Sequence, residues 1–152
     1  MARVYTKPMK TITICSSALF YKHVMEMKEQ LEARGFVVLV PKTALSMAKT
    51  GDFEVLQYKT WFGDANDYHK KADYMLSHFD EVTKGDAVLV VNDAKHGVAG
   101  YIGPNVLMEM ALAFYQRKPI YILNGLPDDS PFEEELKGMM PVILKGDLAQ
   151  IL

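Results

Sequence analysis

Five consecutive apolar residues between Asp86 and Asn92 constrain the fold more than any other feature of the chain: Ala87-Val88-Leu89-Val90-Val91. An apolar run of this length, without polar alternation, is typical of a strand that is buried on both faces of a parallel sheet. After a glycine-rich loop, Gly103-Pro104 predicts the start of a helix, because proline at the first helical position loses no hydrogen bond that the helix needs. A buried strand followed by a helix indicates an α/β fold.

Glu109 is the only charged residue of that helix before Arg117. A lone carboxylate in an otherwise apolar helix is costly to bury unless a partner or a reaction uses it. The helix begins at the edge where the strand ends, and ligands of open α/β sheets bind at this edge. We therefore expect Glu109 to lie desolvated and unpaired at the mouth of a cleft. The alternative is a structural carboxylate that pairs with a buried arginine or tyrosine.

The rest of the chain alternates between predicted strands and predicted helices. The other strands are expected at Thr11–Cys15, Phe36–Val40 (buried), Pro119–Leu123 and Pro141–Leu144. Helices are expected at about Leu19–Arg34, in one or two short pieces around Gly51, from Asp64 to Lys84, and from Ser130-Pro131 onward. The helix from Asp64 carries an apolar stripe: Tyr68, Ala72, Met75, Phe79 and Val82. This order predicts one Rossmann-like or flavodoxin-like domain, with a five-stranded parallel sheet and helices on both faces.

Length and composition restrict the class of protein. A chain of 152 residues forms one domain, which we place at 11–152 after a flexible extension at 1–10. The net charge of −2 argues against a polynucleotide-binding surface. A single cysteine fits a reducing cytoplasm, and the sequence has neither a membrane-length apolar run nor a signal core. We therefore expect a cytoplasmic protein without a membrane partner.

Several polar residues are expected at the same edge of the sheet. Ser16 and Ser17 follow the first strand and are candidate donors to a ligand's hydroxyl or phosphate groups. The glycine loop 97–103 can bring backbone N–H groups to an anion, although a plain flexible connection explains it equally well. Cys15 is expected to be a small buried hydrophobe rather than a nucleophile.

Other candidates are weaker. His78 and Asp80 are about 200° apart around their helix, so they cannot both face the site. Tyr58, Trp61 and Phe62 can stack on a base or simply form core. Histidine, cysteine and carboxylate residues do not occur at metal-ligand spacings along the chain, so neither a metal nor a cofactor is expected.

At this point the chain resembles a known family. The segments 86–92, Tyr101-Ile102-Gly103, Glu109 with Ala113, and Lys118–Tyr121 are similar to those of the nucleoside 2-deoxyribosyltransferase superfamily, and Ile14–Ser17 and 35–41 also fit. That superfamily includes the 2′-deoxynucleoside 5′-phosphate N-hydrolases. The resemblance implies a Rossmann-like fold and cleavage of the N-glycosidic bond of (deoxy)nucleosides or nucleotides. It also implies a homo-oligomer in which a neighbouring subunit completes each site.

The resemblance assigns roles to individual residues. Glu109 occupies the place of the nucleophilic glutamate. The substrate is then expected to contact the following residues: Ser16, Ser17, Asn92, Tyr101, Gly103 and Asn105. Two positions depart from the family pattern, because His78 stands where an aspartate is usual and Gly103 stands where an aspartate or serine is usual.

Three functions follow from this interpretation. The first is an N-glycosidase or deoxyribosyl transferase in which Glu109 attacks C1′ and His78 or water protonates the leaving base. The second is a domain that senses a nucleotide-like ligand without turnover. The third is an oligomeric scaffold without a ligand.

Overall fold

The structure is a computed structural model that describes residues 10–152. The predicted extension at 1–10 therefore lies outside the described residues, except for Lys10. The backbone N–H of Lys10 donates to the Asp86 carboxylate at 3.0 Å, and its carbonyl accepts from the Val37 N–H at 2.8 Å. Lys10 is thus anchored to the sheet.

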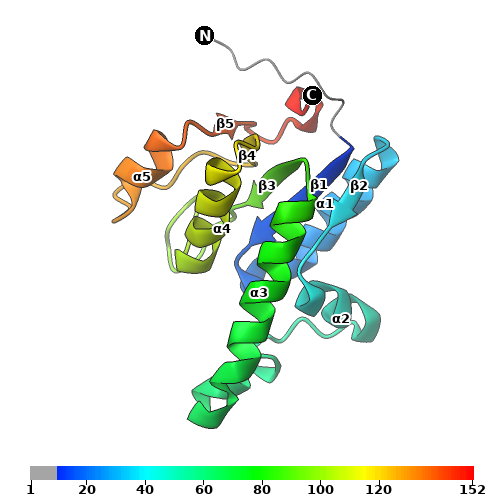
Figure 1. Ribbon diagram of the computed structural model, residues 1–152, viewed down its shortest axis with the longest axis vertical. Helices are drawn as coiled ribbons and strands as arrows, with labels where there is room; N and C mark the ends of the chain where they lie inside the picture. The colour runs from blue at the N-terminus through cyan, green and yellow to red at the C-terminus, as the bar shows by residue number, and fades with distance from the viewer. Residues whose placement is uncertain (1–9) are drawn as a thin grey trace.

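Five parallel strands form a single sheet in the order β2-β1-β3-β4-β5 (Figure 1). The strands are β1 Thr11–Ser16, β2 Val37–Leu39, β3 Ala87–Val91, β4 Ile120–Ile122 and β5 Val142–Ile143. All five residues of β3 are buried, as the apolar run predicts. The sheet confirms the predicted single α/β domain. Successive crossovers change direction between β1 and β3, which is where sheets of this order bind ligands.

Helices cover both faces of the sheet. They are α1 Tyr21–Ala33, α2 Lys42–Thr50, α3 Tyr68–Lys84, α4 Pro104–Tyr115 and α5 Glu133–Gly138. One apolar cluster joins α1 and α2 to the sheet, and the other joins α3, α4 and α5 to its opposite face. Because side chains alternate along a strand, Ile14 of β1 belongs to the first cluster and Cys15 to the second.

Two predictions about individual elements were wrong. The strand expected to be buried at 36–40 is a short edge strand, and the Val37 side chain is 58% exposed because β2 has a neighbouring strand on one side only. The helix expected to open at Ser130-Pro131 begins at Glu133 instead. The Ser130 hydroxyl and carbonyl first accept the N–H groups of Phe132 and Glu133, which forms a turn.

The long helix α3 also differs from its prediction. Asp64 caps a separate helical turn at Ala65–Asp67, and α3 begins at Tyr68. Its 17 residues span about 25 Å, longer than the strand beside it, so its first turns extend past the sheet (Figure 1). Tyr68 and Ala72 of the predicted apolar stripe are therefore exposed, whereas Val82 and His78 are buried.

The glycine-rich loop after β3 is held by close backbone contacts. Lys95 and Val98 exchange backbone hydrogen bonds across His96 and Gly97, which both have positive φ, as in a two-residue hairpin turn. Gly100 also has a positive φ of 69°, and a Cβ atom at this residue would lie 2.2 Å from the carbonyl oxygen of Gly125. The loop is therefore fitted against the segment that follows β4.

The close contact at Gly100 predicts that one methyl group added to this residue lowers the free energy of unfolding substantially. Gly97→Ala is the matched control, because Gly97 has a φ of +74° and its Cβ would meet no atom within 4 Å among residues 10–152. We expect Gly97→Ala to lower the free energy of unfolding by about 1–2 kcal/mol, the strain of the left-handed conformation. Gly100→Ala should lower it by about 3 kcal/mol or more, because the backbone must also move. Equal losses in urea unfolding would contradict the described contact.

Candidate functional site

A cavity of about 300 Å³ opens at the carboxyl end of β1. Its wall includes residues from the loop after β1, the start of α2, the segment 55–61, the middle of α3 and the first turns of α4. The strands β1 and β3 both end at this edge of the sheet, and the chain continues from them in different directions, to α1 after β1 and to α4 after β3. The location agrees with the edge that the sequence indicates for a ligand.

Glu109 lies on the buried side of α4 and lines the cavity. Gly103 is the N-cap of α4 and Pro104 its first residue, so Glu109 stands in the second turn. The residue is only 8% exposed, and its Oε2 atom has no hydrogen-bond partner within the described part of the chain. Burial raises the pKa of the Glu109 carboxyl, and the nearby His78, Cys15 and Lys71 counteract only part of that shift.

His78 is the nearest basic group to that carboxylate. Its Nε2 atom lies 3.6 Å from Glu109 Oε2, and its Nδ1 atom lies 3.0 Å from Glu81 Oε2. Burial by itself lowers the pKa of His78, but the hydrogen bond with Glu81 and the charge of Glu109 outweigh it, and the pKa is raised. The expectation of an unpaired carboxylate is thus met only in part, because Glu109 Oε2 lies at ion-pair distance from a titratable imidazole but too far from it for a hydrogen bond. As expected, Asp80 points elsewhere and is exposed.

Cys15 joins these two residues on the same face of the sheet. It is fully buried, and its Sγ atom lies within 4.8 Å of ligand atoms of both His78 and Glu109. Burial and the neighbouring Glu109 carboxylate raise the pKa of the Cys15 thiol. Since the three residues belong to β1, α3 and α4, spacing along the sequence does not reveal their proximity. The argument from spacing against a metal site therefore does not apply to this cluster.

Ser16 and Ser17 line the cavity as predicted, but both hydroxyl groups already have partners. The Ser16 hydroxyl donates to the carbonyl of Val91 at 2.7 Å. The Ser17 hydroxyl accepts from Lys95 Nζ at 3.1 Å. Ser17 thus positions a lysine at the cavity.

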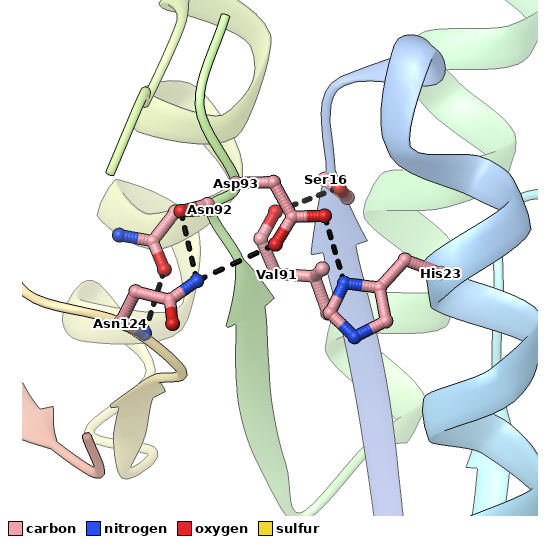
Figure 2. A network of polar contacts seen from close by, with 6 residues as sticks. All are labelled: Ser16, His23, Val91, Asn92, Asp93 and Asn124. Atoms are coloured by element: carbon pink, nitrogen blue, oxygen red, sulfur yellow. Dashed lines mark hydrogen bonds and ion pairs between the residues drawn. The ribbon is translucent and has the colours of Figure 1, made fainter. Parts of the chain in front are cut away.

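Asn92 differs from the other predicted contact residues. It is fully buried and, among the residues described, is not part of the cavity wall. Its side-chain amide donates to the carbonyls of Gly100 and Gly125, and its side-chain oxygen accepts from the Asn124 N–H at 2.9 Å. Figure 2 shows Asn92 and Asn124 bonded to each other at the end of β3, beside the Asp93 carboxylate that contacts His23 at 2.7 Å. The sequence prediction of a substrate contact at Asn92 is corrected to a structural role.

Tyr101, Gly103 and Asn105 line the cavity at the start of α4. A Cβ atom on Gly103 would lie 3.0 Å from the Tyr101 hydroxyl oxygen. A side chain at residue 103 would therefore require the Tyr101 ring to move by a few tenths of an ångström.

Four lysines at the cavity were not identified as site residues from the sequence: Lys42, Lys59, Lys71 and Lys95. Burial lowers the pKa of the half-buried Lys59 amine, and the charges of Lys95 and Lys71 lower it further. Lys59 is therefore close enough to Lys71 and to Lys95 to feel their positive charges, and an anion beside Lys59 would offset them. These lysines lie far apart in the sequence, so only the fold brings them together.

Aromatic side chains form another part of the wall. Trp61 is buried, and its ring centroid lies 6.1 Å from that of Tyr74. Tyr58 also lines the cavity, whereas Phe62 is 67% exposed and, within residues 10–152, lies outside the wall. Two of the three aromatic residues singled out in the sequence thus face the cavity.

No protein-family model and no curated protein sequence matches this chain. Within the described residues, no helix is both long enough and apolar enough to cross a membrane.

The burial of Glu109 predicts a stabilising substitution. A raised pKa means that the ionised carboxylate is less favourable in the folded than in the unfolded state, so at neutral pH its charge destabilises the fold. Glu109→Gln keeps the shape and removes the charge, and should raise the free energy of unfolding by about 0.5–2 kcal/mol. The exposed Glu29→Gln in the middle of α1, which should change little, is the control in urea unfolding at pH 7. A loss of stability in Glu109→Gln alone would contradict this account.

Proposed function

We propose that this protein cleaves the N-glycosidic bond of a (deoxy)nucleoside or nucleoside 5′-monophosphate, with Glu109 as the nucleophile. The sugar is then released to water or transferred to a second base. The observation that carries the proposal is the buried Glu109 carboxylate, which lines a cavity and leaves Oε2 without a hydrogen-bond partner among the residues described. A desolvated carboxylate is a stronger nucleophile than a hydrated one. It can also stabilise the positive charge that develops on a sugar ring as the base departs.

His78 has two parts in this proposal. Its raised pKa favours the imidazolium form, and a positive charge 3.6 Å from Oε2 helps to keep Glu109 ionised before the attack. The bond from Glu109 Oε2 to C1′ forms while the bond from C1′ to the base nitrogen breaks. The departing base takes a proton from His78 or from water. Water or a second base then resolves the glycosyl intermediate.

The rest of the cavity wall suits the other parts of a nucleotide. Trp61, Tyr58 and Tyr74 supply aromatic surface against which a base can pack. Lys59, Lys71 and Lys95 supply positive charge for a phosphate group. We therefore favour a nucleoside 5′-monophosphate over an uncharged nucleoside.

A homo-oligomer belongs to the same proposal, because the resemblance implies that a second subunit completes each site. The exposed apolar side chains of α4 are compatible with such a contact: Met108, Phe114 and Tyr115. The glutamates at 133–135 give no comparable support for such a contact. All three are exposed near the start of α5, where negative charge is favourable without a partner.

The decisive test is release of free base from a panel of deoxynucleosides and their monophosphates, followed by chromatography. We expect release by the wild-type protein and a loss of about 10³-fold or more in Glu109→Gln, since the amide cannot form the covalent bond. Glu134→Gln, an exposed glutamate of α5, should retain the wild-type rate. Thermal stabilisation by a nucleotide without base release would instead support the sensor domain. If the protein neither releases base nor is stabilised by a nucleotide, the result supports the oligomeric scaffold without a ligand.

The lysines predict a preference that can be measured separately. Lys59→Met should raise KM for a nucleoside monophosphate about tenfold and leave KM for the matching nucleoside within about twofold, because one phosphate contact is worth roughly 1.4 kcal/mol. Lys28→Met, on the surface of α1, is the control substitution. A parallel rise of KM for both substrates would contradict a phosphate role for Lys59.

A further inference from the structure

Three side chains from three elements bring metal-binding atoms together beside the cavity. The ligand atoms of Cys15, His78 and Glu109 all lie within 4.8 Å of one another. Each residue is more than nine-tenths buried. A thiol, an imidazole and a carboxylate are all common ligands of Zn²⁺.

Two of these ligand atoms have no hydrogen-bond partner. His78 Nε2 and Glu109 Oε2 are buried and unsatisfied among the atoms of residues 10–152. Buried polar atoms nearly always have a partner in native proteins, so two orphaned atoms that face each other require an explanation. Their separation of 3.6 Å is too long for a hydrogen bond. It is close to the distance of about 3.4 Å between two ligands of one tetrahedral Zn²⁺ ion.

The surroundings of His78 are also those of a zinc ligand. Its other ring nitrogen, Nδ1, lies 3.0 Å from Glu81 Oε2. A carboxylate on the second nitrogen of a metal-binding histidine sets the tautomer that leaves Nε2 free to bind the metal. His78 and Glu109 line the cavity, so an ion can reach the cluster from that side.

We propose that Cys15, His78 and Glu109 bind one Zn²⁺ ion, with the fourth coordination position facing the cavity. The thiol favours Zn²⁺ over Mg²⁺ and Ca²⁺, which prefer oxygen ligands. His78 Nε2 and Glu109 Oε2 are already about as far apart as two ligands of one Zn²⁺ ion, so the Cys15 sulfur needs to approach them by at most about 1 Å. Binding replaces the S–H bond of Cys15 by an S–Zn bond, and the proton goes to solvent.

Zinc and the sugar would compete for the same carboxylate. A Glu109 oxygen that binds Zn²⁺ is not available to attack C1′, so the zinc-loaded protein should not release base; this consequence rests on the proposed function. The metal site itself does not, because it is measured without substrate.

Cobalt provides a direct spectroscopic test. The untagged protein is freed of metal with a chelator, kept reduced and titrated with Co²⁺, which takes the same ligands as Zn²⁺. Cys15 is the only cysteine, so a thiolate-to-cobalt charge-transfer band can arise from this residue alone. We expect the band to saturate at one Co²⁺ per chain and to disappear when one equivalent of Zn²⁺ is added.

Variants then test each ligand. Cys15→Ser should abolish the charge-transfer band, and His78→Gln should weaken Zn²⁺ binding at least tenfold in competition with a chromophoric chelator. Glu81→Gln, which leaves all three ligands in place, should weaken it about tenfold to a hundredfold. His69→Gln is the matched control, since His69 is exposed on the same helix and its Nδ1 contacts the Asn66 carbonyl.

Two results would overturn the proposal. One is the absence of a charge-transfer band in the folded wild-type protein, which needs no variant. The other is Zn²⁺ binding that His78→Gln and His69→Gln weaken equally, which would indicate adventitious surface binding. Base release by the chelator-treated protein is measured in the same preparation. A failure of the glycosidic chemistry therefore leaves the metal titration unaffected, and a failure of the metal titration leaves the base-release result unaffected.

Discussion

A strand that is buried on both faces leaves no place for a polar side chain except at its ends. All five residues of β3 are buried, so the polar groups that this part of the chain carries lie before Ala87 and after Val91. At the first end, the Asp86 carboxylate accepts the N–H groups of Lys10 and Thr11. At the second end, Asn92 binds the backbone of the next two loops. The central strand thus determines where the sheet is anchored and where a site can form.

Asn92 and Glu109, two buried polar residues, differ in how completely their side chains are hydrogen-bonded. The Asn92 amide is satisfied by backbone groups, and with Gly100 it holds the glycine-rich loop in one conformation. Glu109, on helix α4, is also buried, but its Oε2 atom has no hydrogen-bond partner within residues 10–152. Asn92 therefore supports the loop, whereas the Glu109 carboxylate has the His78 imidazole within ion-pair distance. An unsatisfied buried charge persists only where something else stabilises it.

The environment of Glu109 permits more than one use of its carboxylate. His78 is close enough to stabilise the ionised form, yet too far away to occupy the oxygen with a hydrogen bond. Cys15 completes a set of three groups whose preferred partners are an electrophilic carbon or a metal cation. Lysines line the same cavity, and the charges of Lys71 and Lys95 both act on Lys59. Acidic and basic groups thus line one cavity.

The sequence by itself determined the fold class, the central strand, the start of α4 at Gly103-Pro104 and the burial of Glu109. These features depend on local patterns: an apolar run, a proline at a helix start and one charge in an apolar helix. The structure alone decided that Cys15 and His78 adjoin Glu109, that the lysines share its cavity and that Asn92 supports the loop. Such contacts join residues from separate elements, and their distances depend on strand order, helix length and side-chain direction. A long α3 can extend past the sheet, and a buried asparagine can bind backbone rather than ligand, without any change in the local pattern that sequence analysis detects.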